Sequence, residues 1–211
     1  MTSTCEPPSL PANQMLVLGD ALIEFTPFTD YLEQHALDAG ILAPAERIRD
    51  HSAALMSLLA EGSLSIGSQY AEARQAGPAR VVVMDGGETD MLGGLCDSKP
   101  SRDCPSVRNA VRGAQLLLQQ MAENGVQHVF YFFYPDPRGN PQTKAGLDVL
   151  RPLVENVCGH SPLACHWVDL RPVFADHPDY LGADGLVFSE AGARVSAAAI
   201  WERMRERCVV P

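Results

Sequence analysis

The sequence lacks both a hydrophobic run long enough to cross a membrane and an excess of basic residues. None of its apolar stretches reaches the ~18 residues of a membrane-spanning helix. Lysine and arginine number 16 against 26 aspartates and glutamates, which gives a net charge of −10. Nucleic acids and anionic membranes are bound through basic faces, so neither is expected as the main partner.

Internal repeats, low-complexity segments and the usual metal and phosphate motifs are missing as well. There is no CxxC pair of the kind that binds zinc, and Gly86-Gly87 is not followed by the GK[ST] of a phosphate loop. We expect no metal and no other cofactor. Apolar residues make up 46% of the chain and charged residues 20%, which is ordinary globular composition. We expect an extended tail over residues 1–13 and a single domain over residues 14–211.

Cysteine is the residue present in unusual number, with six in the chain. Two pairs bracket short polar loops that contain proline, and the remaining two cysteines lie near opposite ends. Of the 15 pairings that six cysteines allow, we expect three disulfides: Cys96–Cys104, Cys158–Cys165 and Cys5–Cys208. The alternative is a set of reduced, buried thiols. Disulfides predict a secreted or periplasmic protein. Residues 1–11 show no signal peptide, so we expect that a leader has been removed.

Short apolar runs alternate with amphipathic stretches along the chain. The runs predict strands at 15–18, 46–50, 80–84, 126–133 and 164–170. Helices are predicted at 31–39, 53–60, 68–75, 107–124, 145–157 and 190–207, with Ser52 and Ser189 as N-caps. This alternation predicts an α/β fold, a doubly wound three-layer sandwich with a five-stranded, mostly parallel sheet of flavodoxin-like type. Ligands of such folds bind at the carboxyl ends of the strands.

Three loops with polar residues follow predicted strands or precede the last helix. They are Gly19-Asp20-Ala21-Leu22, Gly86-Gly87-Glu88-Thr89-Asp90 and the segment Gly182-Ala183-Asp184-Gly185-Leu186-Val187. In this order they resemble the GDS, GxND and DGxH motifs of the SGNH (GDSL-type) hydrolases. The resemblance extends from about residue 14 to residue 205 and includes YPDP after the fourth strand and VDL in the fifth. It implies the SGNH-hydrolase fold and an esterase-like ancestry.

The resemblance also implies a role for each matching position. The nucleophilic serine falls at Ala21, the basic histidine at Val187, the aspartate that orients it at Asp184, and the oxyanion-hole asparagine at Thr89. A serine hydrolase needs a hydroxyl, a base within hydrogen-bond reach and donors aimed at the oxyanion. Neither alanine nor valine can supply the first two. We therefore predict that no catalytic residue set of this type is intact.

The second motif block departs from the family pattern too. Its glycine is expected just after Arg49-Asp50-His51-Ser52, where the chain has Ala53, Ala54 and Leu55. The positions that still match the pattern include Asp20, Gly87, Asp90 and Gly185. We expect a ligand-binding crevice at the carboxyl edge of the sheet, lined by Asp20, Ala21, Leu55, Gly87, Thr89, Asp184 and Val187.

Other residues near the crevice have simpler interpretations. His51 is expected at a strand end, His166 at the wrong end of the sheet and His177 in an exposed loop. Four carboxylates, Asp20, Glu88, Asp90 and Asp184, are an alternative oxygen-ligand cluster for a divalent metal. Two functions remain open. The first is a non-catalytic binding protein (a pseudoenzyme) for a carbohydrate, an acylated polymer or a small ester. The second is an esterase or acylhydrolase acting on ester or O-acetyl groups, with another nucleophile or with an engineered serine-to-alanine change at position 21.

Overall fold

The carboxyl ends of five parallel strands form one edge of the central sheet. The computed structural model describes residues 11–58, 64–92, 96 and 100–211. Within them the strand order is β2-β1-β3-β4-β5, and every neighbouring pair is parallel. The strands are β1 (Met15–Leu18), β2 (Arg49–Asp50), β3 (Val81–Met84), β4 (His128–Phe133) and β5 (Ala164–Asp169). The predicted flavodoxin-like α/β fold is confirmed.

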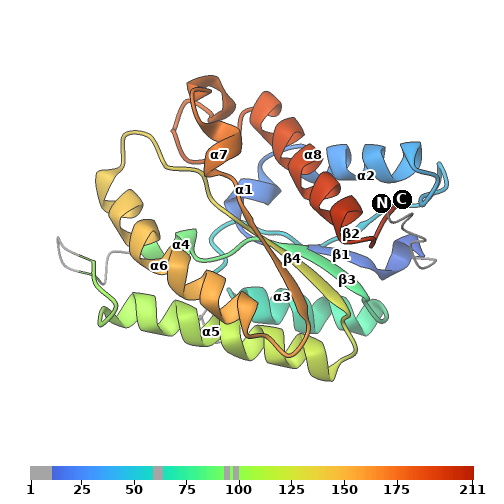
Figure 1. Cartoon of the computed structure of the whole chain (residues 1–211), viewed down its shortest axis with the longest axis horizontal. Coiled ribbons are helices and arrows are strands. Elements are labelled where there is room, and N and C mark those ends of the chain that lie inside the picture. Colours follow the sequence, from blue (N-terminus) through green and yellow to red (C-terminus); the bar gives the residue numbers. More distant parts are fainter. Residues whose placement is uncertain (1–10, 59–63, 93–95, 97–99) are drawn as a thin grey trace, which may run out of the picture.

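Helices cover both faces of this sheet (Figure 1). On one face α2 packs against α8, and on the other α5 packs against α6. The helices are α1 (Ala21–Glu24), α2 (Phe28–Asp38), α3 (Ile66–Ala73), α4 (Glu88–Leu92), α5 (Pro105–Glu123), α6 (Pro141–Gly159), α7 (Arg171–Phe174) and α8 (Glu190–Glu206). Three 3₁₀ turns accompany them: η1 (Ala12–Gln14), η2 (Arg74–Ala76) and η3 (Pro178–Tyr180).

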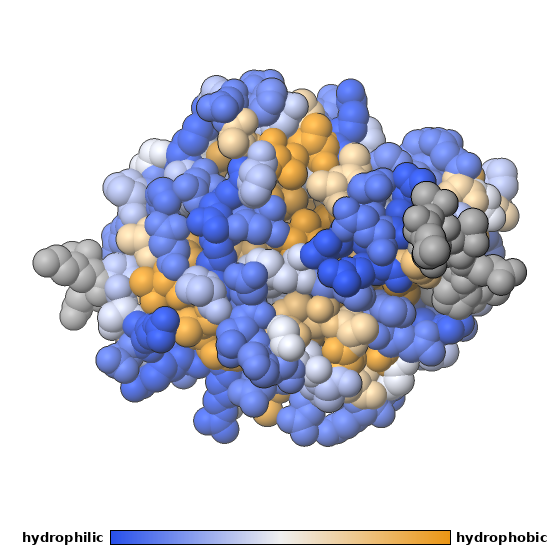
Figure 2. Space-filling model, viewed as in Figure 1, coloured by the Kyte–Doolittle hydropathy of each residue, from blue (hydrophilic) through white to orange (hydrophobic). Residues whose placement is uncertain are grey.

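Burial explains why the central strands β1 and β3 are entirely apolar. Every residue of β1 and β3 is buried, as is typical of a parallel sheet covered on both faces. Helix α5 begins with Pro105 at its first position, where no intrahelical N–H partner is needed. Ser189 caps α8 as predicted, because its hydroxyl oxygen accepts a hydrogen bond from the N–H of Gly192 at 3.1 Å. The outer face shown in Figure 2 is largely hydrophilic, with hydrophobic patches near its centre.

The helix predicted at 53–60 is wrong in its described part. Residues 53–58 form turns and an isolated bridge instead, and residues 59 and 60 lie outside the described ranges. Leu55 has a φ of +61° and its side chain is 65% exposed, so this segment has neither helical backbone nor a buried apolar face. Ser52 therefore caps no helix, and α3 begins after Ser65, whose hydroxyl accepts from Ser68 N at 3.0 Å.

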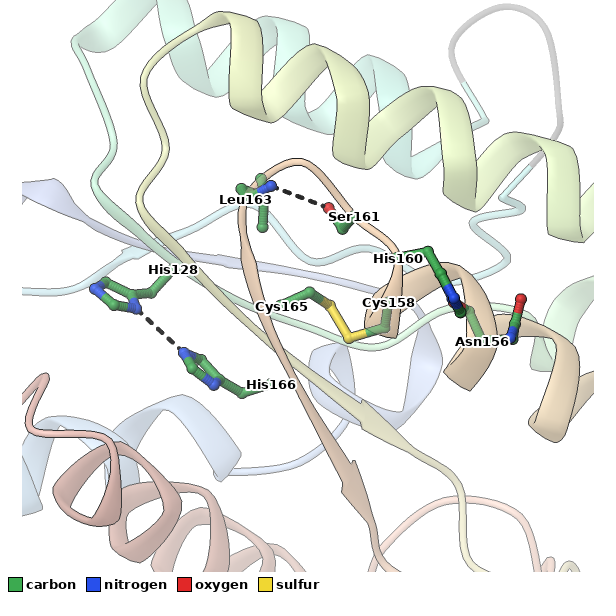
Figure 3. Close-up of a disulfide and its surroundings, with 8 residues drawn as sticks. All are labelled: His128, Asn156, Cys158, His160, Ser161, Leu163, Cys165 and His166. Atoms are coloured by element: carbon green, nitrogen blue, oxygen red, sulfur yellow. Dashed lines mark hydrogen bonds between the residues drawn. A yellow bond between two sulfur atoms is a disulfide. The ribbon is translucent and has the colours of Figure 1, made fainter.

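Two of the expected disulfides are present. Cys96 is bonded to Cys104, with their Cα atoms 5.5 Å apart, and Cys158 to Cys165 at 5.2 Å. The second bridge joins the end of α6 to the start of β5 (Figure 3). The expected Cys5–Cys208 pair involves Cys5, which lies outside the described residues. Disulfides are consistent with an extracytoplasmic protein.

Two further features bear on the expectations for the whole chain. Of the predicted tail, residues 1–10 lie outside the described part and η1 occupies 12–14, so the boundary at residue 14 stays a prediction. Among the described residues, none of the helices combines the length and apolar character needed to span a bilayer.

Removal of the Cys158–Cys165 bridge should lower stability without changing the fold. The bridge closes a loop of sequence separation 7, for which the chain-entropy model gives a loss of about 2–3 kcal/mol. We expect the double variant Cys158→Ser, Cys165→Ser to unfold at lower urea concentration with an unchanged slope. The matched variant Cys96→Ser, Cys104→Ser gives the comparison at a second local bridge. An unfolding midpoint equal to that of the unmodified protein would contradict a stabilising role.

Candidate functional site

The loop after β1 places an alanine at the first position of a short helix. Asp20 precedes α1, and its carboxylate accepts a hydrogen bond from Leu22 N at 3.2 Å, which caps the helix. Ala21 follows as the first residue of α1 and is partly buried. Its side chain is a methyl group, which can neither attack a carbonyl carbon nor donate a proton. The backbone geometry of a strand–turn–helix is thus present without a hydroxyl.

Gly19 allows the residue after β3 and helix α1 to pack closely against the end of β1. A Cβ atom at this position would collide with the carboxylate of Asp85 and with Ile23. The amide side chain of Gln69, on α3, accepts from Gly19 N at 3.1 Å and donates to Gly19 O at 2.8 Å. The backbone of Gly19 is therefore hydrogen-bonded on both sides by one buried side chain.

Three acidic residues are buried beside this turn. Asp20 and Asp85 are fully buried, and Glu88 at the start of α4 is 3% exposed. The carboxylate of Asp85 accepts a hydrogen bond from Asp20 N at 2.9 Å. The carboxylate of Asp20 in turn accepts a hydrogen bond from the Tyr134 hydroxyl at 2.8 Å. Sequence reasoning did not single out Asp85 or Tyr134. The one signal for Asp85 is an acid placed directly after four buried apolar residues, at the end of β3.

Burial dominates the protonation of these three acids. Burial raises the pKa of Asp20, and the hydrogen bond from Tyr134 offsets only part of this rise. Burial and then the neighbouring charge of Asp20 raise the pKa of Asp85 well above its usual range. Burial, followed by the charges of Asp20 and Asp184, raises the pKa of Glu88 to about 9. At neutral pH Glu88 is therefore protonated and can donate a proton but not accept one, unlike a general base.

The loop after β3 uses two glycines and then enters α4. Gly87 has a φ of +115°, and a Cβ there would lie 2.8 Å from Leu150 Cδ2, so a larger residue would be both strained and crowded. Thr89 lies in the first turn of α4 and is partly buried. Asp90 accepts hydrogen bonds from the hydroxyl of Ser57 and from Leu58 N, the latter at 2.9 Å. The acid of this motif thus anchors the segment that follows β2.

The loop before α8 is held in shape by Asp184. Its carboxylate accepts from the backbone N–H groups of Leu186 at 2.9 Å and Val187 at 3.2 Å, which closes a tight turn. Gly185 has a φ of +72°, and a Cβ there would collide with the carbonyl of Arg138. Val187 itself is partly buried. An aspartate that would orient a histidine is therefore bonded to the backbone of its own loop.

The predicted crevice residues come together only in part. The loops after β1 and β3 are joined by the hydrogen bond from Asp20 N to Asp85, and the last loop is joined to the segment after β4 by the hydrogen bond from Arg138 N to Gly185 O. Leu55 differs from the other predicted crevice residues, because its side chain is largely exposed in the turn after β2. The segment before it still follows the sheet, since His51 N donates to Val17 O at 3.0 Å and Ala53 N to Gly19 O at 3.1 Å.

The structure also places the histidines considered as alternatives and tests for a cluster of metal ligands. His166 of β5 has its Nε2 3.1 Å from Nδ1 of His128 (Figure 3). Because His128 is the first residue of β4, this contact lies toward the amino ends of the strands, away from the three loops. His177 lies in the exposed segment between α7 and η3. Across the described part of the chain, the histidines, cysteines and acids form no group of three or more that could hold a metal ion.

Comparisons with known proteins identify the fold of this chain. No protein-family model and no curated protein matches the sequence. Among solved structures, a GDSL-like lipase from Parabacteroides merdae has a TM-score of 0.68 at 13% identity, covering 93% of this chain and 97% of that one. A family 3 carbohydrate esterase from Clostridium thermocellum has a TM-score of 0.66 at 17% identity, covering 92% and 96%.

A third similar structure is a catalytic mutant of an acetylxylan esterase from Geobacillus stearothermophilus. Its TM-score is 0.64 at 14% identity, with coverage of 93% of this chain and 96% of that one. The chain therefore has the α/β fold of SGNH (GDSL-like) hydrolases, as its motif order predicted. At such low identity the likeness defines the architecture and leaves the chemistry to the residues of the site.

The buried acid Glu88 predicts an unusual dependence of stability on pH. Its pKa in the folded chain, about 9, exceeds its ordinary value of 4.5, so the folded state holds this proton more tightly. That contribution to stability is complete below pH 4.5 and is lost as the pH rises toward 9. We expect Glu88→Gln, which stays neutral, to raise the urea midpoint at alkaline pH and to flatten the decline.

The control for this prediction is Glu155→Gln, which alters an exposed glutamate of α6. Unfolding should be followed at about pH 5 and about pH 8.5, on either side of neutrality. The prediction fails if Glu88→Gln and Glu155→Gln change the pH dependence equally.

Proposed function

We propose that this chain is a non-catalytic, exported binding protein built on an esterase fold. The observation that carries the proposal is the pair of side chains at the two reactive positions implied by the family pattern, the methyl group of Ala21 and the isopropyl group of Val187. Without a nucleophile and a base, a serine hydrolase retains only about 10³–10⁴-fold catalysis over water. Thr89, in place of the oxyanion-hole asparagine, weakens that remainder as well.

The neighbouring polar groups support the proposal because their geometry commits them to other contacts. Asp184 is bonded to backbone N–H groups of its own turn, and Asp20 to Leu22 N and Tyr134. Glu88 is buried and protonated at neutral pH. A replacement base among these acids would need to be ionised and turned toward a substrate. In the similar Geobacillus esterase, a single serine-to-alanine change defines a catalytic mutant.

We infer that the bound ligand is a carbohydrate, an acylated polymer or a small ester. Two similar structures are esterases named for carbohydrate substrates, a family 3 carbohydrate esterase and an acetylxylan esterase. Their fold binds ligands at the carboxyl edge of the sheet, where the three loops of this chain lie. The two disulfides favour secretion or a periplasmic location, where such polymers are met.

The catalytic part of the proposal is tested with a chromogenic acetate ester and a fluorophosphonate probe. We expect the unmodified protein to release chromophore at the rate of the buffer and to remain unlabelled. The double variant Ala21→Ser, Val187→His restores the missing side chains and serves as the matched comparison. Turnover well above buffer by the unmodified chain, or its covalent labelling, would refute the proposal and support an esterase with another nucleophile.

The binding part is tested by sedimentation with insoluble acetylated xylan and with the same xylan after chemical deacetylation. We expect the protein to sediment with at least one of the two polymers and not with cellulose, the control solid. Retention in the supernatant with both xylans would contradict the carbohydrate ligand, whatever the outcome of the ester assay.

A further inference from the structure

A hollow beside the last loop brings together three basic side chains in an otherwise acidic protein. Its volume is about 250 Å³, and the segments after β4, around α7 and around η3 form its walls. Arg138, Arg171 and His177 line it, together with Asp136, Phe174 and Leu181. In a chain with a net charge of −10, the two arginines of this hollow are candidates for binding an anion. No role was assigned to these arginines by the motif pattern.

The guanidinium of Arg138 is fixed at the rim of the hollow. Its Nη2 donates hydrogen bonds to Leu181 O at 3.2 Å and to Gly182 O at 3.0 Å. Its backbone N donates to Gly185 O at 2.8 Å, so the loop after β4 and the loop before α8 are joined through this residue. A guanidinium held on one side by carbonyls keeps its remaining N–H donors in a defined direction.

Arg171 is held in a similar way by an acid outside the hollow. Its Nε and Nη2 donate to the carboxylate of Asp169, the shortest of these bonds measuring 2.6 Å. Asp169 is also paired with the buried Arg151 at 3.0 Å. The described hydrogen bonds of the Arg171 side chain all go to Asp169, which leaves Nη1 as a donor for a ligand.

The acid that lines the hollow belongs to a shared network of ion pairs. Asp136 lies 2.9 Å from Lys144 Nζ, which is also 2.9 Å from Asp148. Asp136 lies 3.6 Å from Arg151 Nη2 as well, while Arg151 is paired with Asp169. The arginines of the hollow are not paired with Asp136 by a salt bridge of the described residues. An anion in the hollow would therefore be held by the directed N–H donors of Arg138 and Arg171 rather than by a net positive charge.

The remaining wall is apolar and aromatic. The ring of Phe174 packs against Phe188 with centroids 5.3 Å apart and meets the edge of Tyr180 at 5.6 Å. His177 stacks on Tyr180 with centroids 4.4 Å apart and ring planes 6° apart. These contacts fix the ring positions, so the wall offers a preformed apolar surface next to cationic donors. A sugar ring has a matching apolar C–H face beside polar hydroxyls.

We propose that this hollow binds a single sugar unit carrying a carboxylate, that is, a uronic acid. The carboxylate pairs with the free N–H donors of Arg138 and Arg171, and the ring packs against Phe174. Arginine forks suit carboxylates because planar donors and acceptors match in pairs. The volume is below the roughly 300 Å³ at which drug-sized ligand pockets begin, which fits one monomer rather than a longer segment. This site deepens the carbohydrate-binding function proposed above and rests on it.

The test is calorimetric titration of the full chain with glucuronate, glucose and inorganic phosphate. We expect glucuronate to bind, glucose to bind at least about tenfold more weakly for want of a charge-assisted hydrogen bond, and phosphate to bind more weakly than glucuronate. Arg171→Gln should weaken glucuronate binding at least about tenfold. Arg112→Gln, the same change at an exposed position of α5, should leave it unchanged.

The conservative variant Arg138→Lys keeps the charge but loses the planar fork, and we expect it to weaken glucuronate binding while far-UV circular dichroism stays unchanged. Equal binding of glucose and glucuronate, phosphate binding tighter than glucuronate, or equal effects of Arg171→Gln and Arg112→Gln would overturn the assignment. Failure here is distinguishable from failure of the proposed function, because ester turnover tests catalysis and xylan sedimentation tests carbohydrate binding independently of this hollow.

Discussion

The hydrogen bond from Asp20 N to the carboxylate of Asp85 is the contact on which the carboxyl edge of the sheet depends. It joins the ends of β1 and β3, the adjacent strands between which the strand order changes direction. The absence of a side chain at Gly19 makes room for the carboxylate of Asp85. Tyr134, directly after β4, donates a hydrogen bond from its hydroxyl to the carboxylate of Asp20. The ends of three neighbouring strands are therefore tied together by buried polar groups, and the candidate loops take their positions from this edge.

Such a contact has an energetic consequence. Acids removed from water are costly as anions, so burial raises the pKa of Asp20, Asp85 and Glu88 and favours their protonated forms. The polar groups of this edge are thereby turned toward the protein and used for rigidity. Ester hydrolysis asks for the opposite arrangement, with an ionisable base and oxyanion donors facing the substrate. In this structure Asp20, Asp85 and Glu88 are buried among protein groups.

The long, strongly patterned elements could be predicted from the sequence. The apolar runs of β3 and β4, the amphipathic α5 and the Ser189 cap of α8 all have local causes, namely burial on both faces, helical spacing and a hydroxyl acceptor. The helix predicted from residue 53 failed because its composition is helical while the backbone of Leu55 is left-handed. Tertiary contacts impose that conformation, and local propensity does not register them.

The site was predictable at the level of its loops and not of its buried partners. Motif order located Ala21, Thr89 and Val187 on three loops of one edge. It did not locate Asp85, Tyr134 or Gln69, because motif order does not show which polar residues face inward; only the position of Asp85 directly after an apolar strand gives a signal. Likewise the hollow beside Arg138 joins segments after β4 and β5 with the loop before α8, and their meeting is a property of the folded chain.

The aspartates that match the hydrolase pattern share one property, which is a hydrogen bond between the side chain and the backbone of a loop. Asp20, Asp90 and Asp184 each accept a hydrogen bond from a backbone N–H, at Leu22, Leu58 and Leu186 respectively. Losing any of them would leave loop donors unsatisfied and cost about 1–3 kcal/mol where the donor is buried. A nucleophile or a base makes no comparable contribution to folding, since it acts on substrate. Under the proposed non-catalytic function, these aspartates keep their purpose in stabilising the loops, whereas a serine at position 21 or a histidine at position 187 would serve only the chemistry.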